Sequence, residues 1–556
     1  MADQKYSKSS KTSKESGKQS RSTAVPFLKI ERWLSAHSVH LAYWIIGIGI
    51  LGALLLFNAR ILETDDGLYI EGGYHYAKDF FGYYFTSSAA LYVMFLALPI
   101  ALFGINLLIV KGFSVIFYAV GLYFLYRGFR GRVSGIVFFP AFAVTAFNSV
   151  ILSYASLTFT ESFFMMLQSI FFFVFLRHLD KETVESENIR SNISGWLSVG
   201  VSLLALSLTR NIAVSAVAVV CFYFIYQGKF KNAAAVTGAY AVCWGIVEAL
   251  KKILWGDIIV SQYGGQGKMM LLKNPYDPNS GQETLAGFVD RFFVNSQTFL
   301  SSRFLEILGF RSENSEPNVL LTCVVAGAIL FGAVRMIKNK EKSLLVMVLY
   351  ALGVSMATFI ALATSWGQPR YIMIFTPFFI MTILYGIHDL IKKNNTPLLK
   401  MFYVVVTIGL LGVNVVTTML AAENNLPILQ KNLQGDTFNG YPDEWANYLR
   451  LSQWCADSLG ANTFVACRKP SVSFIYGRGK KFQGIYNVPS TNPDTLLQQL
   501  RSAGVTHIIL DNIAGTVYRY MKTIEEKYPG SFVPVNQMGQ NQTAAYLFII
   551  NYKKVP

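Results

Sequence analysis

The stretch LAYWIIGIGILGALLLFNARILETDDGLY, from Leu41 to Tyr69, decides the fold. Its first part, Leu41–Phe57, carries no charge and approaches the roughly 20 residues that cross about 30 Å of hydrocarbon. The tail before this segment is too long for an ordinary cleaved signal peptide, so we expect a membrane anchor. Asp65 and Asp66 follow shortly after the anchor. The stretch therefore predicts an adjacent pair of carboxylates at a membrane surface.

Further apolar runs of this kind follow along the chain, whose 556 residues are 53% hydrophobic and only 14% charged. This pattern predicts a polytopic α-helical membrane protein. In such a protein the net charge of +16 does not indicate nucleic-acid binding, and residues 1–39 alone contribute a net charge of +5. The Ser/Lys-rich stretch Ser7–Ser22 lacks the apolar residues of a core. We therefore expect residues 1–39 to form a disordered, basic tail that stays in the cytoplasm.

The distribution of basic residues predicts eleven spans. Loops assigned to the cytoplasm carry fifteen Lys and Arg residues, whereas the short outer loops after the first carry only Arg210 and Arg370. The uncharged segment Ser88–Phe103 would invert every later loop if it crossed the membrane, so we expect an interfacial or re-entrant helix there. The expected spans are residues 41–57, 106–126, 133–151, 162–177, 195–209, 211–227, 232–250, 319–336, 343–364, 371–388 and 400–420.

Three parts follow from this topology: the tail, a transmembrane domain at 40–420 and an outer domain at 421–556. The transmembrane domain has a first outer loop at 58–105 and a long outer loop at 251–318. The outer domain is expected to be α/β, with helices at 443–459, 493–503 and 515–527 and strands at 463–467, 505–510 and 546–551. Cys455 and Cys467 lie in it. An oxidising compartment would permit a disulfide between them, although a helix and the next strand need not bring the two Cα atoms close enough.

Ionisable residues gather at the outer ends of the expected spans. They include Asp65, Glu161, Lys111, Arg210 and Arg370. Charges at membrane depth are costly and suggest a function or a buried partner, although each of these side chains could instead snorkel to lipid headgroups. Carboxylates can take up a proton or hold a metal ion, and the planar fork of an arginine suits phosphate. Convergence from several loops favours a functional site.

Taken in order, these motifs resemble those of GT-C-type glycosyltransferases, the group of protein O-mannosyltransferases and the lipid A aminoarabinose transferase. The first-loop signature of that family, an acidic pair followed three residues later by an aromatic residue, resembles Asp65-Asp66-Gly-Leu-Tyr69. Further matches are Leu91–Gly104 for its interfacial helix, Lys111 for the following cation, Glu161 for the second-loop acid, Arg210 for the basic residue between spans five and six, and Arg370-Tyr371 for a late Arg-Tyr.

The resemblance implies inverting transfer of a sugar from a polyprenyl-phosphate carrier to a lipid, glycan or protein acceptor. The expected place is the outer face of a bacterial inner membrane, with the C-terminal domain in the periplasm. Asp65 would be the general base, with Asp66 and Glu161 orienting it or the sugar, or joining it around a divalent metal ion. The residues expected to bind substrate are Tyr69, Lys111, Arg210, Lys268, Arg370 and Tyr371.

One departure from the family leaves the metal site open. Many relatives have a Glu-Lys-Pro-Pro-like stretch late in the first loop, whereas this chain has Tyr84-Phe-Thr-Ser-Ser88. The long loop that carries Lys268 also has two interpretations: it could close over a lipid-sugar site, or its aromatic and basic residues could lie at the membrane interface.

Two other classes of protein remain as alternatives. A polytopic transporter would usually place its charges near mid-membrane and show repeated halves. A non-catalytic envelope-assembly protein would use the outer domain for binding, and Asp65 would then be replaceable. The charges cluster at the outer ends of the spans, and the sequence has no evident repeat. Both observations favour a glycosyltransferase over these alternatives.

Overall fold

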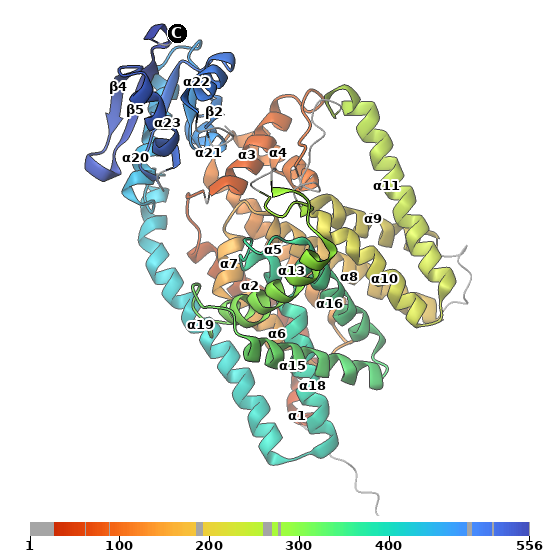
Figure 1. Ribbon diagram of the computed structural model, residues 1–556. Helices are drawn as coiled ribbons and strands as arrows, with labels where there is room; N and C mark the ends of the chain where they lie inside the picture. The colour runs from red at the N-terminus through yellow and green to blue at the C-terminus, as the bar shows by residue number, and fades with distance from the viewer. Residues whose placement is uncertain are drawn as a thin grey trace, which may run out of the picture.

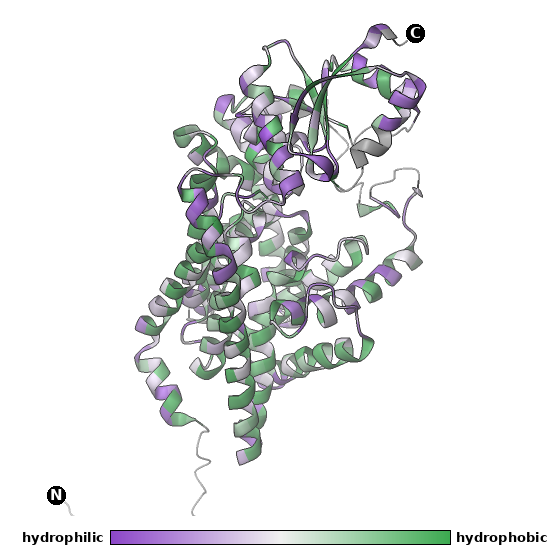
Figure 2. Ribbon diagram, turned by 90° about the vertical axis from the view of Figure 1, so that its left-hand side faces the viewer, coloured by the Kyte–Doolittle hydropathy of each residue, from purple (hydrophilic) through white to green (hydrophobic). Residues whose placement is uncertain are grey.

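The computed structural model of the chain describes residues 27–61, 63–87, 89–184, 193–259, 270–275, 280–485, 492–513 and 516–554. A bundle of apolar helices carries a small α/β domain at one end (Figure 1). Hydrophobic residues run along the bundle helices, and hydrophilic residues gather on the α/β domain (Figure 2). The predicted fold class, a polytopic helical membrane protein with a C-terminal α/β domain, is confirmed.

Helices lie at all eleven expected span positions. By length and composition, however, only seven of the helices in the described residues could each cross a membrane, or eight if the bent pair α6 and α7 is one span. The count of eleven therefore stays a prediction. The helices are α2 (Ser38–Leu55), α5 (Leu107–Phe129), α6 (Gly135–Phe147), α7 (Ser149–Ala155), α8 (Thr160–Val184), α9 (Ile193–Thr209), α10 (Ser215–Tyr226), α11 (Phe230–Ile259), α15 (Val319–Lys338), α16 (Lys342–Ala361), α18 (Thr376–Asn394) and α19 (Pro397–Leu433).

The predicted disordered tail does not extend to residue 39, because α1 (Leu28–Ala36) precedes α2. The Glu31 carboxylate on α1 accepts hydrogen bonds from Ser134 Oγ (2.8 Å) and from the backbone N–H groups of Gly135 (2.7 Å) and Ile136 (3.1 Å). It thereby satisfies free donors at the start of α6. Helix α1 lies at the end of the bundle opposite the α/β domain (Figure 1). Residues 1–26 lie outside the described residues.

The first loop lies at the same end of the bundle as the α/β domain (Figure 1). It consists of α3 (Glu63–Lys78) and the separate apolar helix α4 (Ala90–Phe103). Glycine lets the two helices approach closely, because a Cβ atom on Gly73 would lie 2.9 Å from Ile100 Cδ1 and 3.1 Å from Leu96 Cβ. The expected short helix in this loop is therefore present, packed against the helix that carries the acidic pair.

The C-terminal domain, Asp443–Lys554, is built on a five-stranded sheet of order β2-β1-β3-β5-β4. Strands β1, β2 and β3 are parallel, and β5 pairs antiparallel with β3 and β4. The three expected strands correspond to β1, β3 and β5, whereas α21, β2 and β4 were not predicted. The elements are α20 (Asp443–Ser458), β1 (Val465–Cys467), α21 (Pro470–Tyr476), β2 (Phe482–Gly484), α22 (Pro493–Ser502), β3 (His507–Leu510), α23 (Thr516–Lys527), β4 (Phe532–Met538) and β5 (Ala545–Ile550).

The C-terminal domain packs directly on the first loop. Its helix α21 lies against α3, and a Cβ atom on Gly67 would lie 3.2 Å from Val472 Cγ2. The rings of Tyr74 and Phe474 meet edge to face at 5.2 Å. The predicted boundary at residue 421 falls inside α19, which continues to Leu433 as one helix. Helix α3 is therefore held between the bundle and the C-terminal domain.

Cys455 and Cys467 are both buried free thiols in the C-terminal domain. Burial raises the pKa of Cys455 to about 12 and that of Cys467 to about 11. Thiolates at neutral pH are therefore rare here, and the structure contains no disulfide between these two residues.

A glycine contact between α15 and α18 gives a test of the packing. A Cβ atom on Gly332 would fall against the carbonyl of Thr382, 2.8 Å from its carbon, whereas one on Gly327 of the same helix would meet nothing within 4 Å. We expect Gly332→Ala to lower the free energy of unfolding by about 1–3 kcal/mol through overpacking. Gly327→Ala should leave it unchanged or raise it by about 1 kcal/mol, because alanine favours a helix. Thermal unfolding of the two variants in detergent would test this expectation. Equal unfolding midpoints would contradict the close contact between α15 and α18.

Candidate active site

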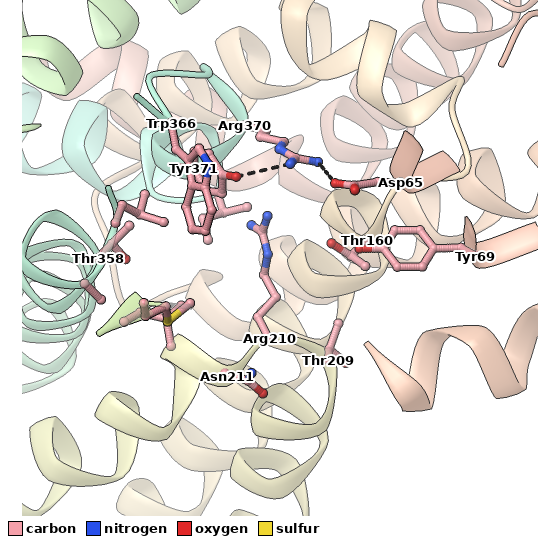
Figure 3. A pocket seen from close by; sticks show the side chains of 15 residues that line it. Asp65, Tyr69, Thr160, Thr209, Arg210, Asn211, Thr358, Trp366, Arg370 and Tyr371 are labelled. Atoms are coloured by element: carbon pink, nitrogen blue, oxygen red, sulfur yellow. Dashed lines mark hydrogen bonds and ion pairs between the residues drawn. The ribbon is translucent and has the colours of Figure 1, made fainter. Parts of the chain in front are cut away.

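A cavity of about 700 Å³ lies beside α3 (Figure 3). Helix α3 is at the end of the bundle next to the C-terminal domain (Figure 1). Segments from distant parts of the chain line it: α3, the start of α8, the end of α9 and the segment before α18. Its lining residues are Asp65, Tyr69, Thr160, Thr209, Arg210, Asn211, Ile212, Met270, Thr358, Ala361, Leu362, Trp366, Arg370, Tyr371 and Ile374.

Asp65 and Arg370, 305 residues apart, form an ion pair on the cavity wall. Arg370 Nη1 donates to Asp65 Oδ2 at 2.7 Å, and Arg370 Nη2 donates to the Tyr371 hydroxyl at 3.1 Å (Figure 3). The Asp65 side chain is 37% exposed and that of Arg370 is 14% exposed. Asp65 is therefore reachable from the cavity, although its charge is already compensated.

A second ion pair lies deeper. Arg210 Nη2 donates to Glu161 Oε1 at 2.8 Å, and the Glu161 side chain is fully buried. The other carboxylate oxygen of Glu161 has no hydrogen-bond partner among the described residues. Glu161 does not line the cavity, so a solute in the cavity would meet Arg210 in front of it.

The ring of Tyr371 contacts both guanidinium groups. Its centroid lies 5.0 Å from the Cζ atom of Arg370 and 5.8 Å from that of Arg210. These are cation–π distances. Arg210 reaches up from the end of α9 toward Tyr371 and Arg370 (Figure 3). The structure thus brings together Asp65, Arg210, Arg370 and Tyr371, which were all predicted to share a site.

Tyr69 also lines the cavity, as predicted, although only 7% of its surface is exposed. Its ring meets that of Tyr92 edge to face at 5.6 Å. Burial, together with the nearby Asp65 and Glu161 carboxylates, raises the pKa of the Tyr69 hydroxyl well above its usual range. The hydroxyl therefore stays protonated and can donate a hydrogen bond.

Asp66 and Lys111 do not line the cavity. Consecutive residues on a helix point about 100° apart, so Asp66 turns inward when Asp65 faces the cavity, and it is fully buried. The Lys111 ammonium group is also buried and donates to the carbonyl oxygens of Asn58 and Arg60, both at 2.6 Å. Lys111 therefore fastens the segment between α2 and α3, and the structure does not support its predicted contact with substrate.

The long loop contributes Met270 to the cavity wall. Arg291, on α13 (Leu285–Gln297), donates to the carbonyl oxygens of Met270 (2.9 Å) and Leu272 (2.5 Å) and pairs with Glu283 at 2.7 Å. These bonds hold the segment at the cavity. Lys268, the predicted contact from this loop, lies outside the described residues.

The possible metal ligands Asp65, Asp66 and Glu161 are separated in the structure. Asp65 faces the cavity beside Arg370, Glu161 lies behind Arg210, and Asp66 points inward. Within the described ranges, no group of three or more His, Cys, Asp or Glu side chains has an arrangement that could hold a metal ion. The side chains now held by arginines would have to rearrange to form one.

Several cavity residues were not predicted. Thr160, Thr209 and Asn211 adjoin predicted residues in the sequence, and Trp366 lies four residues before Arg370. Polar residues next to the charged ends of spans were the signal that could have identified them. Thr358 lies inside the apolar helix α16, and nothing in the sequence singled it out.

Solved structures share this arrangement of helices and C-terminal domain. The oligosaccharyltransferase of Archaeoglobus fulgidus, tethered to an acceptor peptide, superposes with a TM-score of 0.53 at 12% identity, over 94% of this chain and 75% of its own. ArnT from Cupriavidus metallidurans gives 0.54 at 12% identity, over 93% and 99% of the two chains. The chain has the GT-C-type fold.

The complex of the same ArnT with undecaprenyl phosphate also has this fold, with a TM-score of 0.52 at 11% identity over 92% of this chain and 98% of that one. No protein-family model matches the sequence, and no curated protein matches it. The predicted resemblance to GT-C-type transferases is confirmed at the level of fold.

Because the two ion pairs differ in burial, we expect the loss of each carboxylate to lower the free energy of unfolding by a different amount. Glu161→Gln removes the counter-charge of Arg210 at a fully buried position, and we expect it to lower the free energy of unfolding by about 3 kcal/mol. Asp65→Asn breaks a partly exposed pair and should cost about 1 kcal/mol or less. Thermal unfolding in detergent would compare them. A larger loss in Asp65→Asn would show that the cavity pair, and not the buried pair, supports the fold.

Proposed function

We propose that the protein is an inverting glycosyltransferase that moves a sugar from a polyprenyl phosphate to a hydroxyl or amine of a lipid, glycan or protein. The observation that carries the proposal is the meeting of Asp65 with Arg210 and Arg370 in one cavity. The fold adds support, because a transferase that shares it has been solved with undecaprenyl phosphate and another with dolichol phosphate.

The two arginines suit the donor phosphate. Each guanidinium group offers a planar fork of donors, and both lie within cation–π distance of the Tyr371 ring in the cavity wall. Arg370 Nε has no hydrogen-bond partner among the described residues. A phosphate oxygen at Arg370 would compete with Asp65 for the guanidinium group and so free the carboxylate for catalysis.

Asp65 is the candidate general base because it is the cavity carboxylate that solvent reaches. As the acceptor oxygen or nitrogen attacks the anomeric carbon, its proton passes to Asp65 Oδ. The bond between that carbon and the phosphate oxygen breaks, and polyprenyl phosphate leaves with one more negative charge. Arg210 and Arg370 stabilise the developing charge on the leaving phosphate. Attack opposite the leaving group inverts the anomeric centre.

The proposed orientation puts the cavity and the C-terminal domain on the periplasmic side of a bacterial inner membrane. The basic loops support it, since positively charged loops are retained in the cytoplasm. Helices α1 and α3 lie at opposite ends of the bundle, as this topology requires (Figure 1).

Transfer from a radiolabelled polyprenyl-phosphate sugar by the purified full-length protein tests the proposal. Asp65→Asn should lower kcat by about 10²–10⁴-fold, the usual contribution of a general base. Asp79→Asn is a matched control, because Asp79 is an exposed carboxylate in the same loop that accepts a hydrogen bond from the Gly82 N–H at 2.8 Å. It should retain activity. Unchanged turnover by a folded Asp65→Asn variant would remove Asp65 as the base, and no transfer by the wild type would favour a transporter or an assembly protein.

A further inference from the structure

A second cavity, of about 690 Å³, lies beside the candidate active site. The turn between α7 and α8 separates the two: Ser153 and Ser156 line the second cavity, and Thr160 lines the first. Arg60, which also lines the second cavity, precedes Asp65 by five residues. Both cavities are therefore at the end of the bundle next to the C-terminal domain.

The wall of this cavity combines apolar and polar residues and carries one positive charge. Its polar lining residues are Asn58, Arg60, Ser153, Ser156, Asn424 and Asn425, and Arg60 is the only ionisable residue among the described residues that line it. Arg60 Nη1 donates to the Gly440 carbonyl at 2.7 Å, while its Nε has no hydrogen-bond partner among the described residues. The Ser153 and Ser156 hydroxyl groups already donate to backbone carbonyl oxygens, at 2.8 and 2.7 Å. The guanidinium group is therefore the feature of the wall that favours an anion.

Fixed bonds preform the wall. Asn425 Nδ2 donates to the carbonyl oxygens of Leu55 (3.0 Å) and Phe57 (2.8 Å), and its Oδ1 accepts from Asn58 Nδ2 at 3.0 Å. Lys111 lies close enough to Arg60 and Asp66 to interact electrostatically with both. Arg60 in the wall, together with Lys111 and Asp66 near it, makes a group of charges that is positive in sum.

Helix α19 joins this cavity to the lipid-facing surface. Ala421, Asn424, Asn425 and Ile428 share one face of the helix, as their spacing requires, and line the cavity. The neighbouring Val416, Met419 and Leu420 are 54–66% exposed. An amphiphile could therefore lay its acyl chains along α19 with its headgroup in the cavity.

We propose that this second cavity binds the phosphate-bearing headgroup of a lipid, with Arg60 as its anion contact. The lipid lies in the leaflet next to the C-terminal domain. Two sources share this chemistry: an ordinary anionic phospholipid of that leaflet, or a lipid acceptor of the proposed transfer, in which case the assignment rests on the proposed function.

The test is binding of phosphatidylglycerol to the full-length protein in detergent, measured by native mass spectrometry, with zwitterionic phosphatidylcholine as the comparison lipid. Arg60→Gln should weaken phosphatidylglycerol binding by about tenfold, the usual effect of losing a charge-assisted hydrogen bond. Arg478→Gln is the charge-matched control: this arginine is 68% exposed on the C-terminal domain, and its loss should have no effect. Asn424→Trp should also abolish binding, because the larger side chain fills the cavity and leaves Arg60 in place.

If the Asn424→Trp variant binds phosphatidylglycerol as well as the wild type does, the proposal is overturned, whatever the result for Arg60→Gln. It is also overturned if Arg478→Gln weakens binding as much as Arg60→Gln does. These measurements use no sugar donor, so their outcome does not depend on whether the protein is a transferase. A transfer assay then distinguishes the sources. A higher KM for a lipid acceptor in Arg60→Gln, with the donor KM unchanged, identifies the acceptor headgroup, and unchanged kinetics identify an ordinary phospholipid.

Discussion

The ion pair between Asp65 and Arg370 is the contact on which the candidate site depends. It joins the helix of the first loop to the segment before α18, 305 residues later, at 2.7 Å. A carboxylate and a guanidinium group at the edge of an apolar bundle are each costly to desolvate alone, so each needs the other. Arg210 and Glu161 repeat this arrangement one layer deeper. Four charges therefore compensate one another around the ring of Tyr371, and the cavity carries little net charge in the absence of ligands.

The position of Asp65 also depends on hydrogen bonds to the segment that precedes α3. The carbonyl oxygens of Asn58 and Arg60 accept from Lys111, and the Ala59 N–H donates to Asn432 Oδ1 at 2.7 Å. The Tyr441 hydroxyl contacts both the N–H (2.5 Å) and the carbonyl (3.1 Å) of Ile61. Helix α19 and the segment that joins it to α20 thus hold the residues that lead into α3. This accounts for the burial of Lys111: its role is to position the loop.

The sequence predicted the convergence of the site better than its details. Glu161, Arg210 and Arg370 could be placed because each follows or precedes an apolar span, and span ends on the same side of a membrane meet. The sequence did not show that Asp66 and Lys111 turn away from the cavity, because position along a helix does not say which way a side chain points around it. In the C-terminal domain, β4 was missed because its residues are mostly exposed and its sequence, FVPVNQM, includes proline and amides. Helix α21 has only seven residues, too few for a periodic pattern.

The neutral resting site has a consequence for the order of events in the proposed reaction. A carboxylate that is held by a guanidinium group is not free to turn toward an acceptor hydroxyl. In the proposed reaction Asp65 is released when another anion takes its place on Arg370, and the donor phosphate is the anion that the reaction supplies. The carboxylate is then free to take the proton of the acceptor group that attacks the anomeric carbon. Because Glu161 keeps Arg210 in place from a fully buried position, one guanidinium group stays fixed while the other exchanges its partner. The two similar ion pairs thus differ in their exposure to the cavity, and that difference separates a structural pair from one that a substrate can open.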